Sequence, residues 1–122
     1  MGKRILIVED DPSILSLLVI RLKNTGYEVL AAASSEEALG LVGKSVPDLI
    51  LLDLLLPDMQ GEEFCRRIKS DKKLKEIPVI IMTAHTARIE ETVGKIRADD
   101  YVTKPFEPAE LLAKIEKLTI GK

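Results

Sequence analysis

Polar side chains suited to phosphate or metal chemistry follow four short aliphatic runs of the chain. Three consecutive acids, Glu9–Asp11, come directly after the first run, and Asp53 comes directly after another. Thr83 follows a third run, and Lys104, with Pro105 behind it, follows the last. Up to four carboxylates, one hydroxyl and one ammonium group are therefore candidates for a shared site.

These residue types suit the handling of a phosphoryl group and a divalent cation. Carboxylates held close together raise one another's pKa, and a hard cation such as Mg²⁺ relieves the repulsion through oxygen ligands. The Lys104 ammonium and the Thr83 hydroxyl could each hold a phosphoryl oxygen. A carboxylate can also attack phosphorus to form an aspartyl phosphate, and Asp53, which has no acidic neighbour in the chain, is the natural nucleophile.

Taken singly, each of these residues also has an ordinary structural role. Asp53 could be a turn or helix-cap residue, and Glu9–Asp11 could be the acidic start of a helix. Thr83 could be a helix N-cap, and Lys104 a solvated loop charge. Their combined placement has to decide between the two interpretations, and that placement depends on the elements that carry them.

Five aliphatic runs that are too short for helices predict strands buried on both faces. They lie at 5–8, 29–32, 49–52, 79–82 and 101–102. Helical periodicity predicts helices over 13–23 and 35–42 and around 64–68, 89–96 and 111–118. Ser35 is expected as the N-cap of the second helix, and Pro108 in the first turn of the last.

The first helix carries more apolar residues than one buried stripe needs. The expected buried stripe is Ile14, Leu17, Leu18 and Leu22, which leaves Leu15, Val19 and Ile20 beside it. Two interpretations stay open: a broad buried face, or a docking surface for a phosphodonor protein.

The alternation of strands and helices predicts an α/β fold. The expected architecture is a doubly wound, five-stranded parallel sheet with helices on both faces. Ligands of such sheets bind at the carboxyl ends of the strands, near a topological switch point. The polar groups that follow the strands should then meet at one edge, which favours the functional interpretation.

Composition excludes several other classes of protein. The 122 residues suit one domain, and 46% apolar residues are enough for a core. With 20 acids against 18 bases, the chain lacks the basic excess of a nucleic-acid surface. A single cysteine, Cys65, excludes an internal disulfide and favours a reducing, cytoplasmic location. No secretion signal and no apolar run of ~20 residues is visible, so no membrane association is expected.

Longer segments resemble the receiver domains of two-component response regulators over essentially the whole chain. The segments are ILIVEDD at 5–11, PDLILLDLLLPDMQG at 47–61, IPVIIMTA at 77–84 and DDYVTKPF at 99–106. The resemblance implies one receiver domain at 1–122 with the flavodoxin-like (βα)5 fold. It implies that Asp53 accepts a phosphoryl group from a histidine kinase or a histidine phosphotransfer protein. Such a domain is a switch that assists its own phosphorylation and dephosphorylation, not a turnover enzyme.

The resemblance also implies a metal site for Mg²⁺ or Mn²⁺. Glu9 and Asp10 resemble the family's acidic pair, with Asp10 favoured as the direct ligand. This pair is preferred to Asp10 and Asp11 because the 16-residue step from Asp10 to Gly26 resembles the family's spacing. Asp53 and the backbone carbonyl of Leu55 would complete the protein's share of the metal ligands.

The remaining motif residues resemble the parts of a switch. Thr83 resembles the switch hydroxyl that bonds the phosphoryl group, and Tyr101 the aromatic residue that turns inward when Thr83 moves. Lys104 resembles the phosphate-binding lysine, and Lys104–Pro105 would be the family's cis peptide bond. His85, beside the site, is either a solvated loop residue or an influence on dephosphorylation.

One segment departs from the family's pattern. Arg97–Ala98 stands where the family often has Gly-Ala, and the stretch from Thr83 to Lys104 is one residue short. We therefore expect an altered end of the fourth helix. The departure affects the output face, which the resemblance places on the fourth helix, fifth strand and fifth helix, and not the phosphorylation site.

The expected partners are a histidine kinase or phosphotransfer protein, a downstream protein target, and a second copy in a phosphorylation-dependent homodimer. No direct contact with nucleic acid is expected. The main alternative is a phosphate-independent binding module of the same fold. A phosphatase with an aspartate nucleophile would need an Asp-x-Asp motif after the first strand, which Glu9–Asp11 does not match. Flavin binding is weakly disfavoured by an aromatic content of 3%.

Overall fold

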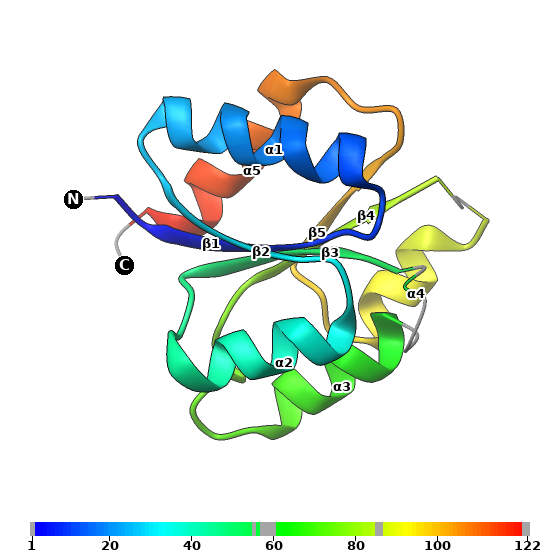
Figure 1. The fold of residues 1–122 in the computed structure, drawn as a ribbon. Coiled ribbons are helices and arrows are strands. Elements are labelled where there is room, and N and C mark those ends of the chain that lie inside the picture. Colours follow the sequence, from blue (N-terminus) through cyan, green and yellow to red (C-terminus); the bar gives the residue numbers. More distant parts are fainter. Residues whose placement is uncertain (1, 55, 57–60, 85–86, 121–122) are drawn as a thin grey trace.

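Strands and helices alternate along the whole chain in the computed structural model, which describes residues 2–54, 56, 61–84 and 87–120 (Figure 1). The strands are β1 (Arg4–Val8), β2 (Glu28–Ala32), β3 (Leu49–Asp53), β4 (Val79–Thr83) and β5 (Asp100–Thr103). The helices are α1 (Pro12–Thr25), α2 (Ser35–Lys44), α3 (Gly61–Ser70), α4 (Ile89–Lys95) and α5 (Pro108–Thr119). All five predicted strands and all five predicted helices are present.

The five strands form one parallel sheet in the order β2-β1-β3-β4-β5. The chain moves outward from β1 to β2 and then returns past β1 to β3, so the strand order reverses between β1 and β3. Such a reversal is the topological switch point at which α/β sheets bind ligands, beyond the carboxyl ends of the strands. The fold is the doubly wound, flavodoxin-like architecture that the sequence predicted.

The helices cover the sheet in two layers, with α1 and α5 on one face and α2, α3 and α4 on the other (Figure 1). The layer under α1 and α5 buries Leu18, Leu22, Leu111 and Ile115 against the sheet, and the opposite layer buries Ala38, Val42, Phe64 and Ile68. The central strands β3 and β4 are buried at every position. Burial on both faces explains why these strands read as unbroken aliphatic runs.

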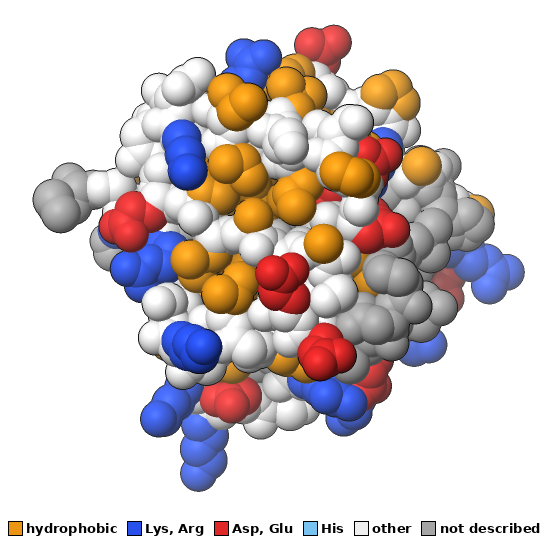
Figure 2. Space-filling model, viewed as in Figure 1, with side chains coloured by type: hydrophobic (Ala, Val, Ile, Leu, Met, Phe, Trp, Pro, Cys, Tyr) orange, Lys and Arg blue, Asp and Glu red, His pale blue; other side chains and the backbone are white. Residues whose placement is uncertain are grey.

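The buried stripe of α1 differs from the predicted one. Leu18 and Leu22 are buried as expected, but Leu17 is 55% exposed. Leu15 and Val19 take its place and pack against the core. Two overlapping helical stripes were available in the sequence, and the packing of α1 against the sheet and α5 selects one of them. Figure 2 shows the hydrophobic side chains that remain on the surface along and below α1.

One helix end differs from expectation, and another is altered as expected. Ser34, not Ser35, is the N-cap of α2, since its Oγ accepts a hydrogen bond from the Glu37 amide at 3.2 Å. The Glu37 carboxylate in turn accepts one from the Ala33 amide at 2.8 Å, in the manner of a capping box. Helix α4 spans only seven residues, and Arg97, which lies just after its end, has a φ of 61°. An arginine thus occupies the left-handed position that usually favours glycine.

Pro108 is the first residue of α5, as predicted. Among the helices that the structure describes, none combines the length and hydropathy that a membrane crossing requires.

Candidate functional site

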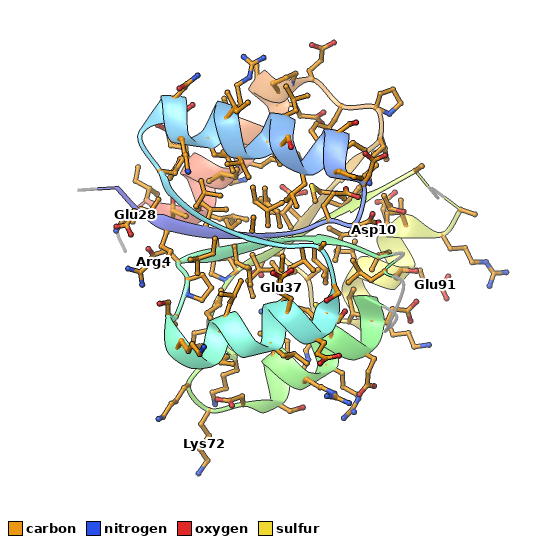
Figure 3. All side chains as sticks on the ribbon, in the orientation of Figure 1. Arg4, Asp10, Glu28, Glu37, Lys72 and Glu91 are labelled. Carbon is orange, nitrogen blue, oxygen red and sulfur yellow. The ribbon has the colours of Figure 1, made fainter. Side chains whose placement is uncertain are left out.

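The sheet topology brings the predicted polar residues to one edge. Asp53 is the last residue of β3 and Thr83 the last residue of β4, while Glu9 follows β1 directly. Lys104 follows β5, and its amide donates to the Thr83 carbonyl at 2.8 Å. Asp10, labelled in Figure 3, lies at this same edge, where the chain turns from β1 toward α1. Residues from four strand ends are therefore neighbours.

Lys104 is the centre of this cluster. Its Nζ lies 2.6 Å from Glu9 Oε1 and 3.0 Å from Asp53 Oδ2, so one ammonium bridges two carboxylates that are 44 positions apart in the chain. The bridge is shielded from solvent, because Glu9 is 1% exposed and Asp53 6%. Charges in such a site interact more strongly than they would in water.

The pKa values of the bridged pair reflect burial and pairing in competition. Burial raises the pKa of Glu9 above its ordinary value, although the hydrogen bonds from Lys104 and from the Asp11 amide lower it, and neighbouring Asp53 raises it further. Burial alone would lower the pKa of Lys104, but its bonds to Glu9 and Asp53 outweigh that effect and raise it. The lysine is therefore held as a cation, and burial disfavours the charged form of Glu9.

Three carboxylates of the cluster suit a metal ion. One carboxylate oxygen from each of Glu9, Asp10 and Asp53 lies within 4.8 Å of the other two. Oxygen donors of this kind are the ligands that Mg²⁺ binds in proteins. A cation here would also favour the charged form of Glu9, whose pKa is raised by burial and by neighbouring Asp53. The donor set therefore fits a hard divalent cation.

Asp11 has a different role from its two acidic neighbours. It is the N-cap of α1, where its Oδ1 accepts hydrogen bonds from the Ser13 amide at 2.9 Å and the Ile14 amide at 3.2 Å. Its own amide donates to Glu9 Oε2 at 3.2 Å. The same residue thus starts the helix and holds the Glu9 carboxylate in place, which agrees with its expected position near the metal ligands but not among them.

Gly61 is a positioning residue that the sequence alone did not single out. A Cβ at this position would lie 2.7 Å from Leu54 Cα and 3.0 Å from the Asp53 carbonyl oxygen. The Gly61 amide donates to the Leu54 carbonyl at 2.9 Å. Only a glycine lets α3 start this close to the segment that follows Asp53. The signal in the sequence was a glycine eight residues beyond Asp53 and three residues before the helix predicted around 64–68.

Thr83 and Tyr101 share one face of the sheet. Tyr101 lies opposite Ile81 in the β4–β5 register, and Thr83 is two residues further along β4. Side chains alternate along a strand, so Ile81, Thr83 and Tyr101 all point to the face covered by α4. Thr83 is 1% exposed, and Tyr101 is partly buried against that layer.

The Lys104–Pro105 peptide bond is cis, the geometry that the resemblance implied. The predicted metal ligand Leu55 and the neighbouring residue His85 lie outside the described residues.

Comparisons with known proteins identify the family. The model of the response regulator receiver domain matches residues 5–116, and the chain belongs to this family. Among curated proteins, the alkaline phosphatase synthesis transcriptional regulatory protein PhoP of Bacillus subtilis is 39% identical over 119 residues, which cover 97% of this chain and 49% of PhoP. The chain spans about half the length of the curated relatives it matches.

Solved structures agree with this membership. The signal receiver domain of a histidine kinase from Syntrophus aciditrophicus superposes with a TM-score of 0.91 at 35% identity, covering 98% of this chain and 92% of that one. The response regulator TrrA of Thermotoga maritima, in complex with Mg²⁺-BeF, gives a TM-score of 0.84 at 38% identity, covering 95% and 98%. Receiver domains are phosphorylation switches of two-component systems that interact with histidine kinases and downstream effectors.

Proposed function

We propose that the whole chain, 1–122, is one receiver domain that accepts a phosphoryl group on Asp53 from a histidine kinase or a histidine phosphotransfer protein. The observation that carries the proposal is the position of Asp53 at the end of β3, with Lys104 Nζ 3.0 Å from its Oδ2 and two further carboxylates beside it. Because Cys65 is a buried free thiol, a reducing, cytoplasmic setting suits the chain.

The transfer itself moves one phosphoryl group between two nucleophiles. An Asp53 carboxylate oxygen bonds to phosphorus as the bond between phosphorus and the donor's histidine nitrogen breaks, and that nitrogen keeps the electron pair. Lys104 already contacts Asp53 Oδ2, so its ammonium is placed to hold a phosphoryl oxygen. Attack by water on the acyl phosphate would later release inorganic phosphate and restore the carboxylate.

A divalent cation completes this proposal. The carboxylates of Glu9, Asp10 and Asp53, with the backbone carbonyl of Leu55, would hold Mg²⁺ or Mn²⁺, which supplies positive charge for the phosphoryl oxygens. Asp11 contributes indirectly, since its amide fixes the Glu9 carboxylate.

The switch would run through the β4–β5 face. A phosphoryl group adds roughly −1.5 to −2 charge and three acceptor oxygens. The Thr83 hydroxyl would donate to one of these oxygens, and Tyr101, on the same face, would move into the space that Thr83 leaves. This movement would reshape the surface of α4, β5 and α5 for a downstream protein or for a second copy of the domain.

The phosphodonor would dock beside α1. A groove of about 360 Å³ lies next to the site, lined by Ile14, Leu17, Leu18, Phe106 and Pro108 together with Lys104. Leu17 is the exposed large aliphatic residue in it, whereas Leu15 is partly buried against the core. We therefore propose Leu17, and not the partly buried Leu15, as the contact residue on α1.

The direct test is the intact mass of the protein after treatment with acetyl phosphate and Mg²⁺. We expect the wild type and the surface control Asp71→Asn to gain one phosphoryl group, and Asp53→Ala to gain none. Omission of Mg²⁺ should prevent the gain. An unmodified wild type under these conditions would instead favour the phosphate-independent binding module.

The docking proposal has its own test. Leu17→Asp should slow phosphotransfer from the cognate kinase while leaving the gain of mass from acetyl phosphate unchanged. Equal rates from the kinase for wild type and Leu17→Asp would contradict this role of the groove.

A further inference from the structure

A second hollow of the surface lies between α3 and α4, separate from the site at the carboxyl edge of the sheet. It has a volume of about 240 Å³ and is lined by Glu62, Glu63, Arg66, Lys95, Ile96 and Arg97. Ile96, which is 9% exposed, forms its apolar floor. We call this hollow the α3–α4 groove. Half of its lining residues are basic, in a chain whose net charge is −2.

The backbone of Arg97 is unusual at this place. The Arg97 amide donates to the Gly94 carbonyl at 3.3 Å and the Ala98 amide to the Val93 carbonyl at 3.0 Å, which is the bonding pattern of a Schellman helix end. In that motif the residue at the position of Arg97 has a positive φ, here 61°, a conformation that glycine adopts without steric conflict. A strained residue of this kind is a reason to look for a function of its side chain.

The two sides of the α3–α4 groove differ in how their charges are paired. On α3, Glu63 accepts hydrogen bonds from Arg66 at 2.9 and 2.5 Å and from Arg67 at 3.1 Å. These bonds lower the pKa of Glu63 to about 2, so Glu63 is negatively charged at neutral pH, and Arg66 and Arg67 balance its charge. On the α4 side, the salt bridges found between described residues involve neither Lys95 nor Arg97. The cationic surplus of the groove therefore belongs to Lys95 and Arg97.

We propose that the α3–α4 groove binds an acidic segment of a partner protein, with Lys95 and Arg97 contacting its carboxylates. An ammonium and a guanidinium group two positions apart suit carboxylate side chains. Glu62 and Glu63 line the same groove, so they would repel the unbroken series of charges on a nucleic-acid backbone but accept the mixed side chains of a peptide. The pattern of charges thus favours a protein partner. The inference does not depend on phosphorylation of Asp53.

The test uses a blocked hexapeptide of alternating Glu and Ser as the probe and backbone amide chemical shifts of the unphosphorylated protein as the readout. We expect saturable shifts at Arg66, Lys95 and Arg97. Arg97→Gly is the informative variant, because it removes the guanidinium and also relieves the left-handed arginine, so the fold is retained or stabilised. Its affinity should fall roughly two- to fivefold, the range for one exposed ion pair, while Arg97→Lys should retain most of the affinity.

A matched control separates this groove from general attraction to basic surface. Lys72, labelled at the lower end of the molecule in Figure 3, is exposed and does not line the groove, so Lys72→Ser should leave the affinity unchanged. Equal binding by Arg97→Gly and the wild type, or an equal loss in Lys72→Ser, would overturn the proposal. A short DNA duplex or inorganic phosphate that gives the same shifts at lower concentration would assign the groove to phosphates and overturn it as well.

Discussion

Two carboxylates of this protein sit beside basic side chains at nearly the same distance, yet their pKa values shift in opposite directions. Glu9 Oε1 lies 2.6 Å from Lys104 Nζ, and the pKa of Glu9 is raised. Glu63 Oε2 lies 2.5 Å from an Arg66 nitrogen, and the pKa of Glu63 is lowered to about 2. Pairing alone does not explain the difference.

Exposure explains it. The Glu9 side chain is 1% exposed, and loss of hydration is the largest influence on its pKa. The Glu63 side chain is 35% exposed, and the hydrogen bonds from Arg66 and Arg67 dominate. The charged form of a buried carboxylate next to Asp53 would be stabilised further by an added cation. The charged form of an exposed carboxylate is already stabilised by its arginines and by water. The pairing of a carboxylate with a basic side chain therefore favours cation binding near Glu9 but not near Glu63.

The largest expected effect comes from removing the basic partner in each region. Lys104→Met would leave Glu9 and Asp53 buried without their cation, and we expect a loss of about 3–5 kcal/mol in the free energy of unfolding. Arg66→Met should cost far less, because its side chain is 65% exposed and Arg67 still contacts Glu63. Urea unfolding without divalent metal measures both. The comparison fails if the two variants lose equal stability.

The next effect is that of Mg²⁺ itself. A ligand that binds only the folded state at ten times its Kd stabilises by about 1.4 kcal/mol. We expect Mg²⁺ to raise the melting temperature of the wild type and of Glu63→Gln alike. Asp10→Asn removes one of the three grouped carboxylates and should lose most of the stabilisation. An equal response of Asp10→Asn would show that the cation binds elsewhere.

The dependence of stability on pH should have opposite signs in the two regions. The pKa of Glu9 is raised above 4.5, so the folded state holds its proton longer than the unfolded state, and stability falls as the pH rises from 4.5 through the folded pKa. The pKa of Glu63 is lowered from 4.5 to about 2, so its contribution is complete above pH 4.5 and is lost as the pH falls toward 2. Unfolding curves of Glu9→Gln and Glu63→Gln, each compared with the wild type across this range, should diverge in opposite senses. Parallel profiles would contradict the role of burial.

The smallest effect concerns a glycine in each region. Gly94 lies inside α4 with open space around an added Cβ, so Gly94→Ala should stabilise the protein by about 0.5–1 kcal/mol. Gly61→Ala should destabilise it, since its Cβ would lie 2.7 Å from Leu54 Cα beside the phosphorylation site. Thermal unfolding of the two variants gives the sign directly. Stabilisation by both would mean that the approach of α3 to Leu54 is not tight.

Much of the fold followed from local patterns. The aliphatic runs at 49–52 and 79–82 predicted central strands, because a strand buried on both faces has no room for polar residues. The alternation with helices predicted the parallel sheet, and the sheet placed Asp53 and Thr83 at one edge. The candidate site was therefore predictable as a set of neighbours.

Details that depend on one or two residues were less predictable. Ser34 and Ser35 are equivalent as N-caps by type, and only the path of the chain into α2 selects Ser34. Likewise, Leu17 and Leu15 are equally apolar, and the contact of α1 with the sheet decides that Leu17 is exposed. Patterns in sequence define a helical stripe only to within one residue or so.

The sequence by itself determined which chemical groups the site contains and that they lie at one edge of a parallel sheet. It did so because the positions of the strands along the chain and the types of side chain are local properties, visible in runs and spacings. The tertiary structure decided which carboxylate is buried against Lys104, which one caps a helix and which one stays exposed. Those outcomes depend on neighbours that are distant in the chain, such as Lys104, 95 residues from Glu9. They also depend on the removal of water by packing. Neither the distant contacts nor the loss of water can be read from the order of residues.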